Sequence, residues 1–350
     1  MDIVQLVRSN ILDLEPYRSA RENIQKGILL DANENPYDVE WGGVKLNRYP
    51  DPHQRGLRKA LSRYLGVEDD QVLAAVGSDE VLDWILKVFC RPGQDQIAIA
   101  EPTYGMYQVM ADIFGISSFR FHLDQEFQFR SELFLASVPS EVKILFLCSP
   151  NNPTGNLLAR KEILQIAHQW GKIVVVDEAY VEFVEGPSLI TELNTTPNLI
   201  LLRTLSKAFG RAGIRLGYAV ASPDVIAQFM KVKSPYNLSS LVMEDGCKVL
   251  SSTDQYLNQV LEIRKERERV ADCLREMDQI EEVFPSQANF LLFRCPKASL
   301  VCNQLLENGI IVRDRSSLEN LGDCIRVSIG TPAENEFFLG KLQKSLESIL

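Results

Sequence analysis

Histidine is scarce in this chain, and the three residues present, His53, His122 and His168, lie far apart in the sequence. None of them has carboxylate partners at the spacing of a metal site, so the sequence argues against a metal centre. The seven cysteines are scattered and form no C-x-x-C pair, which indicates neither a disulfide framework nor a zinc knuckle. Most of them sit in apolar runs, and we expect buried thiols.

The chain also lacks an excess of positive charge and a long hydrophobic run. A net charge of −10 argues against non-specific binding to nucleic acid or anionic membranes, because both depend on basic surface. Local basic sites for small anions stay open. No run approaches the roughly 18 apolar residues of a membrane span, and the first 21 residues lack the basic start and apolar core of a signal peptide. The expected location is the cytoplasm.

Length and composition favour two domains in a globular protein. The chain has 350 residues, of which 45% are hydrophobic and 24% charged. This is too long for one ordinary core. An amphipathic arm at the N-terminus leads into loops rich in Asn, Asp and Pro, which extend to about residue 52.

Continuously apolar segments then alternate with helical patterns. Such segments are residues 72–76, 97–100, 142–148, 172–177 and 199–204. This alternation predicts a layered α/β domain, in which parallel strands are covered on both faces. After about residue 238 the pattern changes to a long charged helical stretch that extends to residue 277, followed by a smaller α+β unit.

Four polar residues come just after predicted strands: Tyr104, Asn152, Asp177 and Lys207. Sites in open α/β sheets lie at the carboxyl ends of the strands. We therefore expect these four side chains to converge on one crevice.

Lys207 lies in the segment TLSKAFGRAGIRLGY, in a polar turn between two apolar runs. A lysine held against a carbonyl compound is an imine-forming nucleophile, although a solvated surface lysine is the ordinary interpretation. Asp177 follows three valines, and a carboxylate there needs a cation, a donor cluster or a cofactor nitrogen, unless it caps a helix. Tyr180 lies nearby and can donate a hydrogen bond into the same crevice.

Other residues could hold anions. Ser78 and Asp79 begin a predicted helix, where they suit either a phosphate site or an ordinary cap. Thr204, Ser206 and Arg215 surround the lysine and supply the groups that hold a dianion. Arg326 stands inside an apolar strand, where it is either exposed at an edge or clamps a carboxylate or phosphate. Asn152 is either a turn former or a ligand-facing amide.

Together these groups match the requirements of pyridoxal phosphate. The motifs NPTG, DEAY and SK, and the arginine eight residues after that lysine, resemble those of the fold-type I aminotransferases. Over essentially the whole chain the segments LDANENP, NRYPD, PTYGMY, CSPNNPTG, VVDEAYVEF, RTLSKAFGRAGIRLGY and IRVSIGT resemble the histidinol-phosphate aminotransferase family.

The resemblance implies an α/β fold, the fold-type I arrangement of pyridoxal-phosphate-dependent transferases. It has a large domain with a mostly parallel central sheet covered by helices, and a smaller α+β domain. Residues 1–28 would form an arm that packs on the small domain or on a partner subunit. Residues 29–240 would form the cofactor-binding domain, and residues 241–350 the interdomain helix and small domain.

The resemblance also implies residue roles. Lys207 would be the Schiff-base lysine, Asp177 the partner of the pyridinium nitrogen, and Tyr104 the ring that stacks on the cofactor. Asn152 and Tyr180 would donate to the phenolic oxygen. The phosphate would be held by Ser78, Asp79, Thr204, Ser206, Arg215 and, from the other subunit of a homodimer, Tyr49. The substrate would be bound by Arg326, Arg313, Tyr17, Asn33 and Asn152.

The implied reaction is transamination of L-histidinol phosphate with 2-oxoglutarate, which yields imidazole acetol phosphate and L-glutamate in histidine biosynthesis. It would proceed in two half-reactions through Lys207. The alternatives on the same fold are an aromatic aminotransferase and a threonine-phosphate decarboxylase. A non-catalytic module that binds pyridoxal phosphate is the alternative from another functional class.

Overall fold

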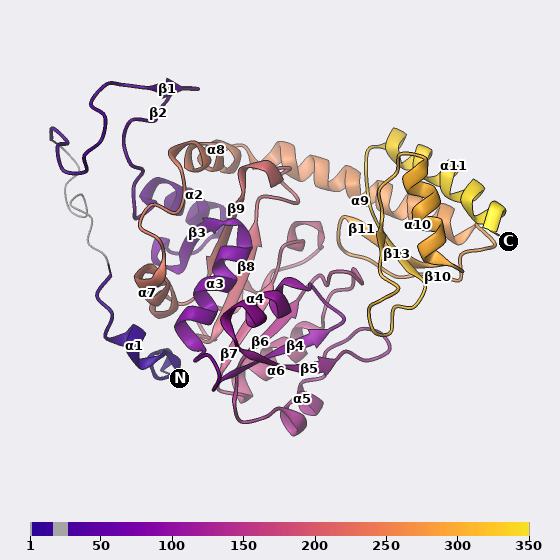
Figure 1. Cartoon of the computed structure of the whole chain (residues 1–350), viewed down its shortest axis with the longest axis horizontal. Coiled ribbons are helices and arrows are strands. Elements are labelled where there is room, and N and C mark those ends of the chain that lie inside the picture. Colours follow the sequence, from indigo (N-terminus) through magenta and orange to yellow (C-terminus); the bar gives the residue numbers. More distant parts are fainter. Residues whose placement is uncertain (1, 17–26, 350) are drawn as a thin grey trace.

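The computed structural model describes residues 2–16 and 27–349, which form a large part and a smaller C-terminal part (Figure 1). The large part contains a seven-stranded sheet. Its strands lie in the order β3 (Val72–Val76), β9 (Leu216–Val220), β8 (Leu199–Thr204), β7 (Ile173–Asp177), β6 (Val142–Cys148), β4 (Gln96–Glu101) and β5 (Ser117–His122). β9 is antiparallel to both of its neighbours, whereas β8, β7, β6, β4 and β5 run parallel. The predicted α/β fold with a mostly parallel sheet is confirmed.

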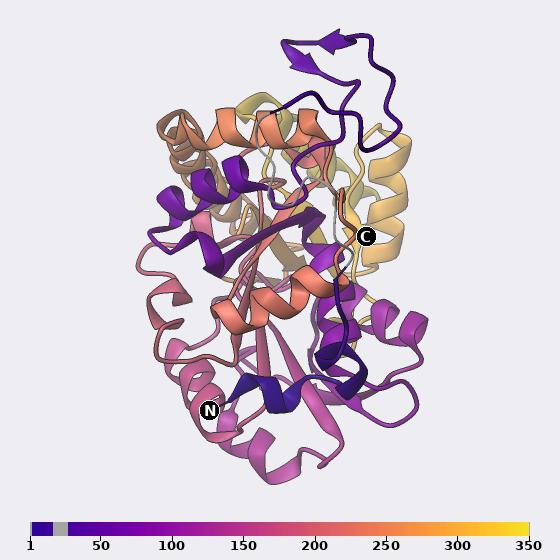
Figure 2. The same cartoon turned by 90° about the vertical axis from the view of Figure 1, so that its left-hand side faces the viewer.

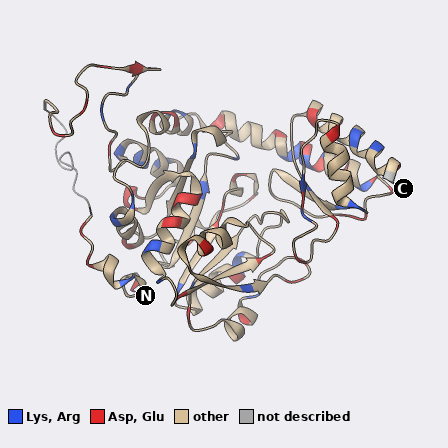
Figure 3. Ribbon diagram, in the orientation of Figure 1, with Lys and Arg blue, Asp and Glu red and all other residues tan. Residues whose placement is uncertain are grey.

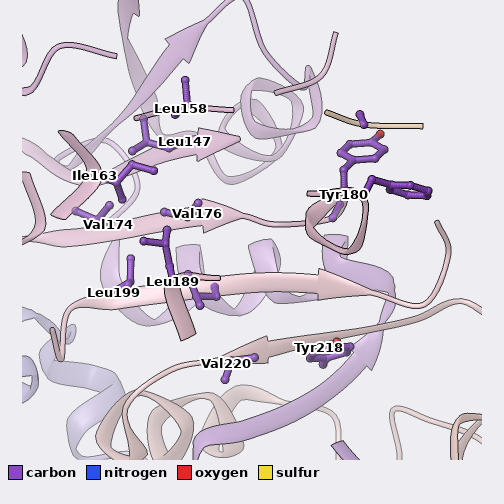
Figure 4. Packing of buried hydrophobic residues seen from close by; sticks show 14 of the residues in the cluster. Leu147, Leu158, Ile163, Val174, Val176, Tyr180, Leu189, Leu199, Tyr218 and Val220 are labelled. Atoms are coloured by element: carbon purple, nitrogen blue, oxygen red, sulfur yellow. The ribbon is translucent and has the colours of Figure 1, made fainter. Parts of the chain in front are cut away.

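The central strands are buried at every position, because helices cover both faces of the sheet. Alternate residues of β7 enter different cores: Val174 and Val176 pack on one side, and Ile173 and Val175 on the other. Figure 4 shows side chains of the first core, with Tyr180 beyond the end of β7. Each buried aliphatic side chain stabilises the fold by about 1.5–3 kcal/mol. Packing on both faces therefore holds the strands, and the residues at their carboxyl ends, in place.

Two sets of helices cover the sheet, one on each face. The first set is α3 (Gly77–Phe89), α4 (Met106–Phe114) and α7 (Pro223–Val232). The second set is α2 (Arg55–Leu65), α5 (Ser131–Ser137), α6 (Arg160–Gln169) and α8 (Ser240–Leu250). α2 ends at Gly66, whose φ of 69° is the left-handed conformation that glycine adopts without strain.

The small part follows α9 (Thr253–Arg275), along which acidic and basic residues alternate (Figure 3). Its antiparallel sheet has the order β10 (Glu282–Val283), β11 (Phe290–Arg294), β13 (Cys324–Ser328) and β12 (Arg313–Asp314). Helices α10 (Ala298–Glu307) and α11 (Pro332–Ile349) complete a separate core. The predicted charged helical stretch forms two helices, and the first of them, α8, packs on α2 of the large part.

The described N-terminal residues include η1 (Ile3–Leu6) and α1 (Ser9–Leu12). Ile3, Val7 and Ile11 are buried in the core that α3 and α7 share, so residues 2–16 pack on the large part of the same chain rather than on the small part. Further on, the hairpin of β1 (Glu40–Trp41) and β2 (Val44–Lys45) projects from the large part in both views (Figures 1 and 2). Trp41 is 72% exposed there.

Some short elements were not predicted. β5 was missed because SSFRFH is a mostly polar segment at the sheet edge. Short 3₁₀ helices are η2 (Asp69–Gln71), η3 (Val181–Phe183), η4 (Leu189–Glu192) and η5 (Ala212–Ile214). Within residues 2–16 and 27–349, no helix has the length and apolar character needed to cross a membrane. All seven cysteines are free thiols, and four of them are buried.

Candidate active site

A cavity of about 550 Å³ lies between the large and small parts, at the carboxyl ends of β6, β7 and β8. Most of the residues singled out in the sequence line it. These are Ser78, Asp79, Tyr104, Asn152, Asp177, Tyr180, Thr204, Ser206, Lys207, Arg215, Arg313 and Arg326. The structure therefore brings the four predicted strand-end residues into one crevice.

Asp177 is the last residue of β7 and is buried. The Tyr107 hydroxyl donates a hydrogen bond of 2.9 Å to its Oδ2, and the backbone N–H of Ala179 donates one of 3.1 Å to its Oδ1. Burial raises the pKa of Asp177 to about 6, against the opposing effect of these two hydrogen bonds. A cationic group in the cavity would offset the cost of charging this carboxylate.

Lys207 follows β8 and lines the cavity. Its side chain is in contact with solvent through the cavity, although the cavity walls surround part of it. Its Nζ lies 5.7 Å from the ring centroid of Tyr180. The surrounding walls lower the pKa of Lys207 by desolvation, and the charge of Arg326 lowers it further, while Asp177 acts in the opposite direction. A lowered pKa makes the free amine more available as a nucleophile and proton carrier.

The start of α3 forms one end of the cavity, and its N-cap residue, Val76, makes no side-chain cap. Gly77 has a φ of 71°, and a Cβ atom there would lie only 2.7 Å from Nη2 of Arg215. The hydroxyls of Thr204 and Ser206 are 2.9 Å apart at the same end. The N–H of Gly77 donates to the carbonyl of Arg215 at 2.9 Å. The positive end of a helix, two hydroxyls and a guanidinium are suited to binding a phosphate. Asp79 faces Arg215 at 3.9 Å.

Tyr104 and Asn152 connect this end with the rest of the cavity. The Tyr104 hydroxyl lies 3.4 Å from Oδ1 of Asp79, and its ring packs edge-on against Tyr107, with centroids 5.6 Å apart. Oδ1 of Asn152 accepts a hydrogen bond from Nη1 of Arg326. This contact links the loop after β6 to β13 of the small part.

The small part contributes arginines. Arg313 of β12 lies opposite Arg326 of β13 in the antiparallel register. Arg315, which the sequence analysis did not single out, lines the cavity beside them. The sequence R-D-R could have indicated Arg315, because residues two apart in an extended chain point to the same face, and Arg313 was already a candidate.

Tyr107 was the other residue that the sequence analysis missed. It lies three residues after Tyr104, and its fully buried ring stacks on Phe146 with centroids 5.0 Å apart. Tyrosine on the apolar face of a helix ordinarily indicates core packing. Only the tertiary structure shows that its hydroxyl meets Asp177.

Two predicted residues do not line the cavity of their own chain. Asn33 is exposed, and the ring of Tyr49 stacks on Tyr236, with centroids 4.5 Å apart. Tyr17 lies outside the described residues. The roles of these three residues stay predictions.

One group of potential metal ligands occurs in the described part of the chain: Glu101, His122 and Glu319. Two of them are exposed and Glu101 is partly exposed. Glu101 also faces Arg120 at 3.7 Å. This group does not line the cavity that holds Lys207.

Residues 9–342 match the family described as aminotransferase class I and II. The chain belongs to this aminotransferase family. It is 42% identical over 344 residues to a histidinol-phosphate aminotransferase of Parabacteroides distasonis, with 98% of each chain covered. It is 41% identical to one of Christiangramia forsetii, with 99% of each covered.

Solved aminotransferase structures have the same fold. The histidinol-phosphate aminotransferase of Clostridium acetobutylicum has a TM-score of 0.80 and 26% identity, over 87% of this chain and 92% of its own. That of Sinorhizobium meliloti, in complex with pyridoxal-5'-phosphate, has a TM-score of 0.80 and 25% identity, over 87% and 84%. These similarities agree with the fold-type I arrangement.

Proposed function

We propose that this aminotransferase transfers the amino group of L-histidinol phosphate to 2-oxoglutarate, with pyridoxal phosphate as cofactor, in histidine biosynthesis. The proposal is supported by the names of relatives that are 41–42% identical over nearly the whole chain. The observation that carries it is one cavity in which Lys207 and the buried Asp177 face a cluster of arginines.

The residues of the large part fit the cofactor. The uncapped start of α3, the two hydroxyls and Arg215 suit its phosphate, Asp177 suits its ring nitrogen, and Lys207 suits its aldehyde. In this proposal Asn152 and Tyr180 donate to its phenolic oxygen, and Tyr104 is the stacking ring. When bound, the cofactor supplies a ring that stabilises negative charge on the amino-bearing carbon of the substrate.

Asp177 maintains the positive charge of the ring nitrogen, because its carboxylate lies in a buried environment of low dielectric. The hydrogen bonds from Tyr107 and from the N–H of Ala179 fix its orientation. In the first half-reaction Nζ of Lys207 removes the proton from the amino-bearing carbon of the substrate. In the second it donates a proton to the carbon of 2-oxoglutarate that becomes amino-bearing. The lowered pKa of Lys207 favours the free amine that the first of these steps requires.

The arginines bind the anionic end of each substrate. Arg313 and Arg326 hold the phosphate of L-histidinol phosphate in one half-reaction and a carboxylate of 2-oxoglutarate in the other, because guanidinium forks bind both anions. The bond from Arg326 to Asn152 places this anchor directly beside the cofactor site. Asn33 and Tyr17 complete the substrate site.

We place the active enzyme in the cytoplasm as a homodimer, in which Tyr49 reaches the cofactor phosphate of the other subunit. Tyr49 is 51% exposed and stays outside its own cavity. Large apolar side chains are also exposed in the segment that precedes it in the sequence, including Ile28 at 90%, Leu30 at 85% and Trp41 at 72%. Such a surface is typical of an interface with another subunit. The domain boundaries at residues 28 and 240 belong to the same proposal.

Initial rates with a substrate panel test the function. Purified enzyme loaded with pyridoxal phosphate is given L-histidinol phosphate, L-phenylalanine or L-threonine phosphate, with 2-oxoglutarate as acceptor, and carbon dioxide release is measured in parallel. We expect L-histidinol phosphate to have the highest kcat/KM and no carbon dioxide to form. A higher kcat/KM for phenylalanine, or carbon dioxide from threonine phosphate, would contradict the proposal.

A further inference from the structure

The small part directs three arginines at the cavity, whereas the anchoring role needs only two. We propose that the third, Arg315, is a specificity-determining residue that favours a dianionic phosphate end of the amino donor over a singly charged carboxylate. This inference rests on the proposed function, because it concerns the substrate of the same site.

The backbone of Arg315 is held in place. Its N–H donates a hydrogen bond of 2.8 Å to the carbonyl of Cys324, which extends the pairing of β12 with β13 by one residue. Arg313 lies two residues earlier, so both side chains leave the extended chain on the same face. The backbone position of the third arginine is therefore set by the sheet.

The side chain of Arg315 has unused hydrogen-bonding capacity. Its Nε is buried and has no hydrogen-bond partner among the described residues, although the side chain lines the cavity. A buried donor without an acceptor costs about 1–3 kcal/mol, and more when the group is charged. An anion in the cavity would supply the missing acceptor.

Among the described residues, no carboxylate forms a salt bridge with Arg315. The carboxylate next to it, Asp314, accepts hydrogen bonds from the Ser299 hydroxyl at 2.5 Å and from the Ser316 N–H at 2.8 Å. Burial lowers the pKa of Arg315, and the charges of Arg326 and Arg313 lower it further, while Tyr180 and Asp314 act in the opposite direction. Like charges on facing strands destabilise the sheet unless an anion lies between them.

Positive side chains outnumber carboxylates in the cavity as a whole. Five basic side chains line it, namely Lys207, Arg215, Arg313, Arg315 and Arg326, against two carboxylates, Asp79 and Asp177. Asp79 and Asp177 belong to the wall formed by the large part, where Arg215 and Tyr107 face them. The arginines of the small part are therefore left for the substrate.

The number of acceptor oxygens separates the two kinds of substrate. A phosphate monoester has three terminal oxygens and two negative charges, whereas a carboxylate has two oxygens and one charge. Two guanidinium forks satisfy a carboxylate, but a third matches the additional oxygen and charge of a phosphate. Arg315 should thus act mainly on the half-reaction of the phosphate substrate.

The test compares kcat/KM for L-histidinol phosphate, L-glutamate and L-phenylalanine in wild-type enzyme and in Arg315→Gln. Loss of a charged contact to a phosphate should lower kcat/KM for L-histidinol phosphate about 30-fold, mostly through KM. We expect about a 3-fold loss for glutamate and no change for phenylalanine, because a smaller anionic charge weakens the contact. Arg315→Lys, which keeps the charge but loses the fork, should give an intermediate loss.

The matched control is Arg275→Gln on α9, whose guanidinium pairs with Asp272 at 2.7 Å and does not line this cavity. It should leave all three values unchanged. An equal loss for all three substrates in Arg315→Gln, or no loss for any, overturns the inference.

A second measurement separates this inference from the proposed function. Inorganic phosphate is used as a competitive inhibitor of the glutamate half-reaction. If wild-type enzyme does not convert L-histidinol phosphate, the proposed function fails. In that case a roughly tenfold weaker inhibition by phosphate in Arg315→Gln still supports the role of Arg315, and equal inhibition overturns it.

Discussion

The wall that the large part gives to the cavity carries its polar groups at the ends of buried strands and pairs them with one another. The wall of the small part carries arginines around a short edge strand, and none of them forms a salt bridge with a carboxylate among residues 2–16 and 27–349. Asp177 thus has a fixed donor in Tyr107, whereas Arg313 faces another arginine, Arg326. The first wall is organised for a ligand that stays bound, and the second for anions that enter and leave.

A buried ion pair behind the first wall strengthens this contrast. Nε and Nη2 of Arg203 donate to Oε2 of Glu178 at 3.0 and 2.8 Å. Glu178 follows Asp177 and Arg203 precedes Thr204, so the pair joins the two strand ends that carry the cofactor-facing groups. Breaking such a pair by removing one partner costs about 3–5 kcal/mol. The ion pair therefore ties together the two strand ends of the cofactor wall.

The largest effect is expected from removing the amine of the first wall. Lys207→Ala should lower turnover by about 10⁴-fold, because general acid-base catalysis at the substrate carbon is lost together with the link to the cofactor. The measurement is steady-state kcat with L-histidinol phosphate, alongside the visible absorption of the loaded enzyme. Lys248→Ala on α8, whose side chain is 63% exposed, is the control. Full turnover with unchanged absorption in Lys207→Ala would show that the assignment is wrong.

A smaller and more selective effect is expected from the second wall. Arg326→Gln should lower kcat/KM for L-histidinol phosphate and glutamate by about 10²-fold, because truncating a charged contact costs about 2–5 kcal/mol. Phenylalanine, whose side chain carries no charge, should lose far less. Cofactor affinity should remain near the wild-type value, which separates the two walls. If Arg326→Gln released the cofactor as readily as it weakened substrate binding, the contrast between the walls would not hold.

The smallest effect is expected for Tyr107→Phe, which removes one hydrogen bond from Asp177 and keeps the stacked ring. A hydrogen bond to a charged group contributes about 1.5–3 kcal/mol, so cofactor affinity at pH 8 should fall about tenfold. Tyr37→Phe, at a side chain that is 79% exposed, is the control and should show no change.

The same variant has a predicted pH dependence. The hydrogen bond from Tyr107 lowers the pKa of Asp177, which burial raises to about 6. Cofactor affinity requires the carboxylate, so it should decline as the pH falls through that value. In Tyr107→Phe the decline should begin at a higher pH. Titration of cofactor binding between pH 5 and 8 measures this, and identical profiles for the two proteins would rule out the positioning role of Tyr107.

The stability of the empty protein should also depend on pH. The pKa of Asp177 is higher in the folded than in the unfolded protein, so ionisation of Asp177 destabilises the empty protein as the pH rises toward 6. Bound cofactor should restore stability above pH 6.

The sequence was most informative where structure is local. Continuous apolar runs such as residues 173–176 predicted buried parallel strands, and the polar residue after each run predicted which side chains meet in the cavity. The antiparallel direction of β9 was not predicted, because strand direction depends on how the chain returns to the sheet. Tyr107 and Arg315 were missed for a similar reason. The importance of Tyr107 comes from Asp177, 70 residues away, and that of Arg315 from the neighbouring charge of Arg326, both of which the folded chain brings close.

A single-turnover reaction tests the central claim, that one wall keeps the cofactor while the other binds an exchangeable anion. Enzyme loaded with pyridoxal phosphate is mixed with L-histidinol phosphate and no acceptor, and the visible absorption is followed. We predict that one equivalent per chain removes the absorption, that no carbon dioxide forms, and that 2-oxoglutarate restores the absorption without added cofactor. Loss of cofactor into solution, or no spectral change with L-histidinol phosphate when phenylalanine gives one, would contradict the account.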